Sequence, residues 1–258
     1  MIAFDIHARD QVASTNSCIK ELIVEGAPEG TVVMAKEQVG GYGRRGHAWV
    51  SPEGGLYLSI LVRPRERVAT EDAAALMAKV PTLSLVTGLA VRQGLCRMLP
   101  EQAAEQIKVK WPNDVMVLRD GVLAKLCGIS LEGTPDALCL GVGVNVLPPE
   151  GVERDDRCAY ALDLAEGAEV TVSRAAHCVL GSFAEHYEAW LAQPFSSFLR
   201  GFEEANALAG CVVAVREGSE VTEGSFAGVD ERGRMLLRQH DGGIRAIVSG
   251  EAHIERFA

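Results

Sequence analysis

Short apolar stretches recur through the first half of the chain, and their spacing predicts strands. Residues 31–35 and 55–62 each have the composition of a buried strand, and the second stretch ends before Pro64, which cannot donate to a sheet ladder. Four more stretches follow with short turns between them, at 107–111, 115–118, 126–131 and 137–144. This spacing favours a meander of mostly antiparallel strands over alternating strands and helices.

Apolar residues at helical spacing mark three other segments. Residues 17–23 predict a short helix, and residues 14–16, Ser-Thr-Asn, offer side-chain oxygens that can cap its first turn. Residues 71–99 predict either one long core helix or two helices joined at Pro81. Residues 174–191 predict a helix that closes this part of the chain.

The pattern changes after residue 209, where the apolar stretches become shorter and glycine turns separate them. These stretches lie at 211–215, 222–229, 235–238 and 244–248. A run of short hairpins predicts a small β-barrel. We therefore predict an α+β protein with two domains: a mixed, mostly antiparallel sheet flanked by helices in residues 1–208, and a barrel in residues 209–258.

The charge balance argues against a surface built for nucleic acid. The formal net charge is −10, whereas binding to phosphate backbones needs clustered lysine and arginine. A local basic cluster at Arg63, Arg65 and Arg67 is predicted to be a solvated loop. We expect no nucleic-acid partner.

Cysteine usage and hydropathy place the protein in a reducing compartment. The seven cysteines are irregularly spaced and form no C-x-x-C pair, which argues against a disulfide framework and a zinc site. The N-terminus becomes charged too early for a signal peptide, and no apolar run approaches the ~20 residues of a membrane span. We expect a cytoplasmic protein that does not enter a membrane.

Residues 40–49 combine four glycines with Arg44 and Arg45. Glycine allows backbone N–H groups to approach a phosphate closely, and guanidinium groups match phosphate oxygens in pairs. The loop has neither the Walker pattern nor the dinucleotide fingerprint. Trp49, at its end, either stacks on a purine or anchors the following strand. We predict that this loop holds a phosphorylated ligand.

A second polar motif, Lys110-Trp111-Pro112-Asn113-Asp114, lies at the end of a predicted strand. The proline turns the chain and places Asn113 and Asp114 on one rim, although Asn-Asp after proline is also an ordinary turn sequence. Lys125 begins the next strand but one of the meander, and Asn145 follows its last strand. Both side chains are expected to converge on the same rim.

These motifs, taken in order, resemble the signature of biotin protein ligases. They are residues 14–16, Gln38 with 41–46, 110–114, 125–129 and 143–145, and the likeness extends to 249–251. The resemblance covers nearly the whole chain. It implies a catalytic domain of the biotin/lipoate ligase type followed by a C-terminal SH3-like barrel.

The resemblance also implies a two-step reaction. Biotin and Mg-ATP would give biotinyl-5′-AMP and pyrophosphate, and a lysine of a biotin carboxyl carrier domain of a biotin-dependent carboxylase would then attack the mixed anhydride. Positive charge around the α-phosphate would offset the charge that develops in the transition state. A sheet edge could pair with a second copy, giving a homodimer, or with the carrier, and the sequence does not decide between them.

The resemblance assigns roles to individual residues. Those implied to bind biotin are Ser14, Thr15, Asn16, Gln38, Gly41, Lys125 and Gly128. Those implied to bind ATP or the adenylate are Tyr42, Arg44, Arg45, Trp49, Asn113 and Asn145. The magnesium of the triphosphate would meet Asn113 and Asp114, and the implied catalytic residues are Arg44, Lys110 and Lys125.

Two positions depart from the family pattern, because Tyr42 and His47 stand where basic residues are usual. We expect slower adenylate formation or looser ligand retention, which a Tyr42→Arg variant would test through pyrophosphate exchange. The glycines of the loop predict that it orders only when ligand supplies a counter-charge.

Three other functions compete with biotin ligation. The Ser-Thr-Asn motif begins at residue 14, which leaves no room for the N-terminal helix-turn-helix of repressor-type ligases. A lipoate or octanoate ligase would have a related fold, and a sensor would bind biotin or adenylate without transfer. Tyr42 is the feature that most favours the sensor, whereas the 110–114 motif and the C-terminal hairpins favour biotin ligation.

Overall fold

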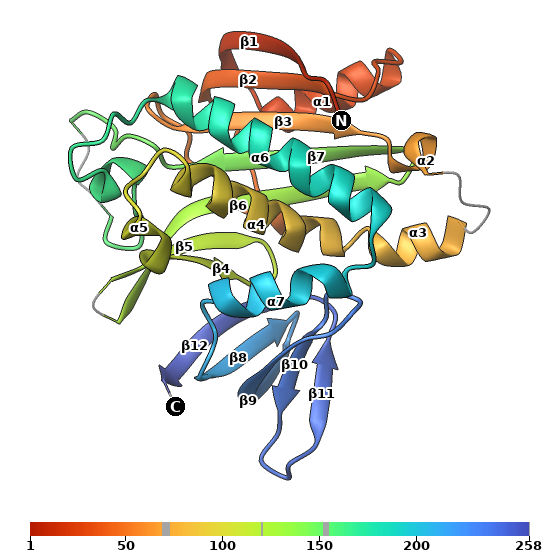
Figure 1. Ribbon diagram of the computed structural model, residues 1–258, viewed down its shortest axis with the longest axis vertical. Helices are drawn as coiled ribbons and strands as arrows, with labels where there is room; N and C mark the ends of the chain where they lie inside the picture. The colour runs from red at the N-terminus through yellow and green to blue at the C-terminus, as the bar shows by residue number, and fades with distance from the viewer. Residues whose placement is uncertain (69–72, 120, 152–154, 258) are drawn as a thin grey trace.

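The computed structural model describes residues 1–68, 73–119, 121–151 and 155–257 and contains two β-sheets with helices around the larger one (Figure 1). The first two positions of the helix predicted from residue 71 and the last residue of the predicted barrel lie outside these ranges. Among the helices of the described ranges, none combines the length and the apolarity that a membrane crossing needs. All seven cysteines are free thiols.

The larger sheet has seven strands, in the order β1-β2-β3-β7-β6-β5-β4. They are β1 Asp5–Val12, β2 Thr31–Gln38, β3 Leu56–Val62, β4 Ile107–Lys110, β5 Asp114–Arg119, β6 Val122–Thr134 and β7 Ala137–Val144. Only β1 and β2 pair in parallel, and every other neighbouring pair is antiparallel. The predicted mixed, mostly antiparallel sheet and its meander from β4 to β7 are confirmed.

Helices cover both faces of this sheet. They are α1 Thr15–Val24, α2 Pro64–Arg67, α3 Ala73–Lys79, α4 Thr82–Cys96, α5 Ala103–Gln106, α6 Val172–Ala192 and α7 Ser196–Ala205, with 3₁₀ turns η1 Arg44–Gly46 and η2 Ala161–Leu164. The long helices α4 and α6 pack together on one face (Figure 1). Since α3 ends before Pro81 and α4 starts after it, the second alternative for residues 71–99, two helices, is confirmed.

Strand β3 is buried on both faces, and its successive side chains point alternately to the two faces of the sheet. Leu58 and Ile60 belong to the main core under α4 and α6. Leu61 instead packs with Val33 and α1 in a smaller cluster, and Ser59 contacts the start of α1. The α1 side of the sheet therefore carries polar groups, whereas the α4 side is apolar.

The start of α1 differs from the sequence prediction. Ser14 occupies the position before the first helical residue, but its side chain makes no capping hydrogen bond. Thr15 and Asn16 are buried within the helix's first turn and bond to other segments. The side-chain cap expected from residues 14–16 is wrong, because these polar groups are used across the sheet instead.

The C-terminal sheet has five antiparallel strands, in the order β11-β10-β9-β8-β12. They are β8 Cys211–Glu217, β9 Glu220–Val229, β10 Met235–Arg238, β11 Ile244–Ile247 and β12 Glu251–Phe257. The separate hairpin unit is confirmed, but its closure into a barrel is wrong, because β11 and β12 lie at opposite edges of the order. Val213, Met235 and Leu237 join the main core, and the Trp111 indole N–H donates to the Gly233 carbonyl at 2.9 Å.

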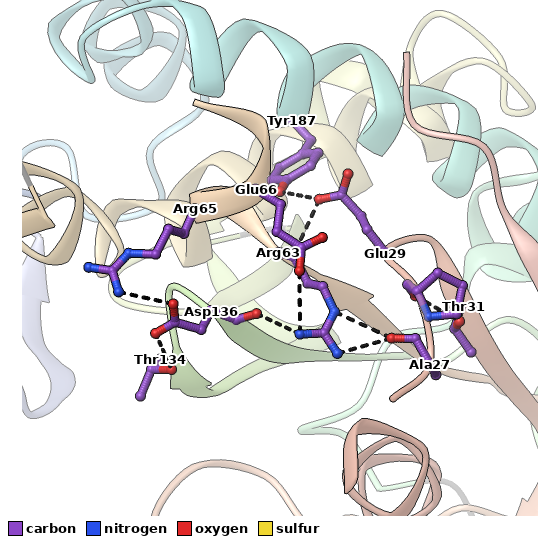
Figure 2. Close-up of polar contacts among 10 residues, drawn as sticks. Ala27, Glu29, Thr31, Arg63, Arg65, Glu66, Thr134, Asp136 and Tyr187 are labelled. Atoms are coloured by element: carbon purple, nitrogen blue, oxygen red, sulfur yellow. Dashed lines mark hydrogen bonds and ion pairs between the residues drawn. The ribbon is translucent and has the colours of Figure 1, made fainter. Parts of the chain in front are cut away.

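The arginines predicted to form a solvated loop lie instead in and beside the short helix α2. Glu29 accepts hydrogen bonds from the Arg63 backbone N–H at 3.0 Å, from the Tyr187 hydroxyl at 2.8 Å and from Arg67 at 2.6 Å. Figure 2 shows Glu29 between Arg63 and Tyr187, with Glu66 also close to the Arg63 guanidinium. This network ties β3 and α2 to α6, so the basic cluster is structural.

Candidate active site

A cavity of about 380 Å³ lies on the α1 side of the sheet. The glycine-rich segment 38–51, which we call the flap, forms one wall, and β12 of the C-terminal sheet closes another side. The sequence-predicted site residues that line this cavity are Ser14, Thr15, Asn16, Gln38, Tyr42, Arg44, Arg45, Trp49, Lys110, Asn113, Asp114, Lys125 and Gly128. The flap arginines and the 110–114 motif therefore face a shared space.

Gly41 and Asn145 are predicted site residues that do not line the cavity. The Gly41 carbonyl accepts the Trp49 backbone N–H at 2.9 Å, and a Cβ at residue 41 would lie 2.6 Å from both the Trp49 carbonyl and the Ser51 hydroxyl. The Asn145 amide donates to the Lys125 carbonyl at 3.0 Å. Both residues hold the backbone of residues that do line the cavity, and their direct ligand contacts stay predictions.

One end of the cavity is uncharged and fixed by hydrogen bonds. The Gln38 amide oxygen accepts from the backbone N–H of Thr15 at 2.8 Å and lies 3.1 Å from its hydroxyl. The Gln38 amide nitrogen donates to the Ser51 hydroxyl at 2.8 Å. Because both ends of this amide are engaged, its orientation is set before any ligand arrives.

Asn16 is oriented by groups that the sequence prediction missed. Its amide oxygen lies 2.6 Å from the Ser59 hydroxyl, and its amide nitrogen donates to Ser130 at 2.9 Å and to Glu132 at 3.1 Å. Gly141 has no room for a side chain, since a Cβ there would lie 2.3 Å from the Asn16 amide oxygen. The sequence does contain a signal for these partners, because serines lie inside apolar strands and a buried hydroxyl needs a hydrogen-bond partner.

The other end of the cavity is cationic. The Arg44 guanidinium donates to the Asn113 amide oxygen at 3.3 Å, and the Lys125 Nζ lies 2.9 Å from Asp114 Oδ1. The Asn113 amide nitrogen donates to the Ile129 carbonyl at 2.7 Å, which directs its oxygen toward Arg44. The 110–114 motif therefore binds the flap tip on one side and the β6 lysine on the other.

Burial perturbs two of these cations. Desolvation lowers the pKa of Lys110, while the charge of Asp114 opposes this shift and that of Lys125 adds to it. Desolvation also lowers the pKa of Arg44, with the neighbouring Arg45 as the second cause. Both shifts therefore report mainly the removal of these cations from water, and a bound anion would oppose them. In a protein of net charge −10, the grouping of Arg44, Lys110 and Lys125 around one cavity points to an anionic ligand.

The Trp49 indole lies flat against glycines of two neighbouring strands. A Cβ on Gly143 would lie 2.7 Å from the indole nitrogen, and a Cβ on Gly128 would lie 3.0 Å from the ring. The Lys125 Nζ lies 5.3 Å from the ring centroid and 3.5 Å from the position of a Cβ on Gly128, so it lies beside the same glycine. The two glycines therefore leave room for a planar group, and the Trp49 ring lies there with a cation nearby.

The flap is a narrow hairpin closed by two isolated bridges, Gln38 with Ser51 and Tyr42 with Ala48. At its tip, Arg45 and Gly46 have left-handed φ angles of 55° and 74°, which turn the chain back. His47 near this tip lies 3.4 Å from Glu251 at the start of β12. The C-terminal sheet therefore contacts the flap as well as lining the cavity.

Comparison with known proteins agrees with this arrangement. The sequence profile of the "Biotin/lipoate A/B protein ligase family" matches residues 9–146, and that of the "Biotin protein ligase C terminal domain" matches residues 212–253. The bifunctional ligase/repressor BirA of Bacillus subtilis is 28% identical over 249 residues, covering 95% of this chain and 72% of the relative.

Two further comparisons extend the likeness. The biotin–[acetyl-CoA-carboxylase] ligase of Paracoccus denitrificans is 29% identical over 228 residues, covering 80% of this chain and 83% of the relative. The solved biotin protein ligase of Aquifex aeolicus in complex with biotin and ATP superposes with a TM-score of 0.79 at 28% identity, covering 98% of this chain and 99% of that one. Both sheets of the fold are included in this similarity.

Proposed function

The chain belongs to the biotin/lipoate A/B protein ligase family, and we propose that it activates biotin with ATP and transfers it to a carrier lysine. The observation that carries this proposal is the shared cavity. Gln38 and Thr15 present fixed amide and hydroxyl groups at one end, and the flap arginine meets lysines at the other. An acyl-adenylate has the same division between an uncharged ring and an anionic phosphate.

In the first step, a biotin carboxylate oxygen attacks the α-phosphorus of ATP. The bond between the α-phosphorus and the bridging oxygen breaks, and pyrophosphate leaves with the electron pair. Arg44, Lys110 and Lys125 would lie around the reacting phosphate and offset negative charge on its oxygens. Their positions support the roles predicted from the sequence.

In the second step, the amine of a carrier lysine attacks the carbonyl carbon of biotinyl-5′-AMP. An amide bond forms, the anhydride bond to the phosphate oxygen breaks, AMP leaves, and the amine nitrogen loses a proton to solvent. The flap closes one wall of the cavity, so its displacement would admit the lysine. Retaining the adenylate until then protects the anhydride from hydrolysis.

Magnesium would enter with the triphosphate. The described residues contain no group of three or more His, Cys, Asp or Glu side chains that could hold a metal ion. Asp114 Oδ1 is buried, and its contact with Lys125 lacks hydrogen-bond geometry, so this oxygen has no hydrogen bond from the described residues. Mg²⁺ typically takes one or two carboxylates plus phosphates and water, so Asp114 beside Asn113 fits that requirement. The ion would neutralise charge on the phosphates.

The expected partner is a biotin carboxyl carrier domain of a biotin-dependent carboxylase, because relatives are named for acetyl-CoA carboxylase. The match of residues 212–253 to a biotin protein ligase module favours biotin over lipoate or octanoate. The homodimer and the cytoplasmic location stay predictions.

One assay separates ligation from the alternatives. Purified protein, labelled biotin, Mg-ATP and a carboxylase carrier domain should give one label on one carrier lysine, and omission of ATP should abolish it. The matched variants are Lys125→Met in the cavity and Lys36→Met, whose exposed lysine pairs with Asp10 on the surface. Only the first should lose activity. Biotin binding without transfer would establish the sensor instead, and preferred transfer of lipoate would establish the related ligase.

A further inference from the structure

Tyr42, at the flap position where a basic residue was expected, is bonded to a lysine from another element. The Nζ of Lys20 donates to the Tyr42 hydroxyl at 2.9 Å and lies 5.4 Å from the centroid of its ring. The same ammonium donates to Glu132 Oε2 at 2.6 Å. Helix α1, strand β6 and the flap, far apart along the chain, are thus joined by one cation.

This contact continues to the cavity wall. Glu132 Oε1 accepts the Asn16 amide N–H at 3.1 Å, and the Asn16 amide lines the cavity. One carboxylate therefore holds both the ammonium that binds the flap and an amide that faces the ligand space. A movement of Tyr42 with the flap would therefore be transmitted to Asn16 by way of Glu132.

The lysine stays charged in this setting. Hydrogen bonds to Glu132 and then to Tyr42 raise the pKa of Lys20 above its ordinary value. Hydrogen bonds from an ionised donor are stronger than neutral ones. The Lys20 side chain is 46% exposed and that of Glu132 35%, so solvent weakens the pair. The tether is accordingly modest in strength.

The flap depends on such restraints because it is rich in glycine. Gly40, Gly41, Gly43 and Gly46 increase the conformational entropy lost on ordering it. Beyond the hairpin's own bridges and the His47 contact with Glu251, the polar side-chain contacts of the described flap tip are the Arg44 bond to Asn113 and the Tyr42 bond to Lys20 of α1. Tyr42 and Arg44 therefore fasten the flap to two different segments of the chain.

We propose that Lys20 is a positioning residue that tethers the flap through Tyr42 before ligand binds, so that Arg44 is already held over the cavity. The tether differs from the sequence expectation that the loop orders only with ligand. It also places a cation beside residue 42, where the sequence indicated that charge was missing. Its consequence for biotin binding rests on the proposed ligase function, whereas the tether itself does not.

Limited trypsin digestion of the ligand-free protein tests the tether directly, because cleavage after Arg44 and Arg45 requires the flap to open. Lys20→Met should speed cleavage at these two sites by about three- to tenfold, and Tyr42→Phe by less, since the ring contact remains. The double variant should match Lys20→Met, because both changes break one interaction. Lys20→Arg should restore slow cleavage.

Lys36→Met provides the matched control, since its exposed lysine in β2 pairs with Asp10 of β1 at 2.7 Å. It should leave flap cleavage unchanged. Equal cleavage of the flap in the parent, Lys20→Met and Tyr42→Phe would overturn the tether, as would equal acceleration in Lys36→Met. Mass spectrometry of the fragments assigns each cut, so the trypsin site lost at residue 20 does not confuse the result.

A kinetic measurement links the tether to ligand retention. Lys20→Met should raise the biotin dissociation rate and the KM for biotin about threefold to tenfold and change kcat by less than twofold, because a preordered flap mainly slows release. Lys20→Arg should recover the parent values. A fall in kcat with KM unchanged would contradict a positioning role. If the parent itself forms no biotinyl product, the proposed ligase function fails, while the digestion still decides whether the flap is tethered.

Discussion

The Nζ of Lys125 lies 2.9 Å from Oδ1 of Asp114, across the paired strands β6 and β5. This lysine therefore has a counter-ion in the ligand-free protein. Lys110 lies in the same cavity, and burial lowers its pKa. Before ligand binds, Lys125 is therefore paired with a carboxylate, whereas Lys110 is distinguished by its burial. The effect of burial on Lys110 can be measured.

Phosphate binding should weaken as the pH rises through the alkaline range below 10.5, the ordinary lysine value. The lowered pKa means that free Lys110 loses its proton earlier than an ordinary lysine, and a bound phosphate favours the charged form. Binding of ATP should therefore take up protons in this range and be strongest below the lowered pKa. Calorimetry in buffers of different ionisation enthalpy measures the uptake. Lys110→Arg should remove it, and persistence of the uptake in that variant would assign it to another group.

Arg44 and Arg45 are adjacent but should contribute very differently. Arg44 is half-buried and bonded to Asn113, whereas Arg45 is exposed at the turn. Arg44→Ala should speed release of the adenylate about 10- to 100-fold, whereas Arg45→Ala should change it about threefold or less. Stopped-flow release of the preformed adenylate compares them. Equal effects would show that charge near the flap matters rather than the Arg44 contact.

Gly141→Ala should damage the cavity through Asn16. The new methyl group would lie 2.3 Å from the Asn16 amide oxygen and 2.5 Å from the Ser130 hydroxyl, so one of them must move. We expect biotin affinity to fall about tenfold and stability to fall by about 1–3 kcal/mol. Gly181→Ala is the control, because no atom outside the neighbouring backbone of α6 lies within 4 Å of its added Cβ. It should stabilise by about 0.5–1 kcal/mol. Calorimetry with biotin and urea unfolding measure both effects.

Glu29→Ala should destabilise the fold without touching the cavity. It would leave Arg67 with Glu188 as its remaining carboxylate partner and would remove the acceptor of the Tyr187 hydroxyl and of the Arg63 backbone N–H, at a cost of about 1–3 kcal/mol. Glu66→Ala removes an exposed carboxylate 3.8 Å from Arg63 and should cost less than about 0.5 kcal/mol. Urea unfolding of both variants gives the comparison. A Glu29 effect as small as that of Glu66 would mean that solvent replaces the network of Figure 2.

The strands of the meander were predictable because their apolar runs are uninterrupted and short turns separate them. Strand β1 was not, because most of its side chains are exposed at the sheet edge and no hydrophobic pattern marks it. The hairpins after residue 209 were equally clear from the sequence. Whether these hairpins close into a barrel depends on which edge strands pair with each other. The alternation of apolar and polar residues carries no information about that pairing.

Most predicted cavity residues do line one cavity, because motifs at strand ends and loops converge when those elements share a sheet. The partners that orient them were less accessible. Glu132 and Lys20 are separated by 112 positions, and nothing in either local sequence indicates the other. Gly41 and Asn145 belong to the recognised motifs but do not line the cavity. A residue inside a motif can therefore hold the backbone of its neighbours rather than contact the ligand.

The wall contributed by Gly250 to His253 means that no single half of the chain holds the whole cavity. A break between α7 and β8 would yield two fragments, each with an unfinished pocket and one side of the Trp111–Gly233 junction. Fused to two proteins that bind one another, such fragments would regain biotinylation only on reunion. The geometry therefore lends itself to a split reporter of molecular proximity.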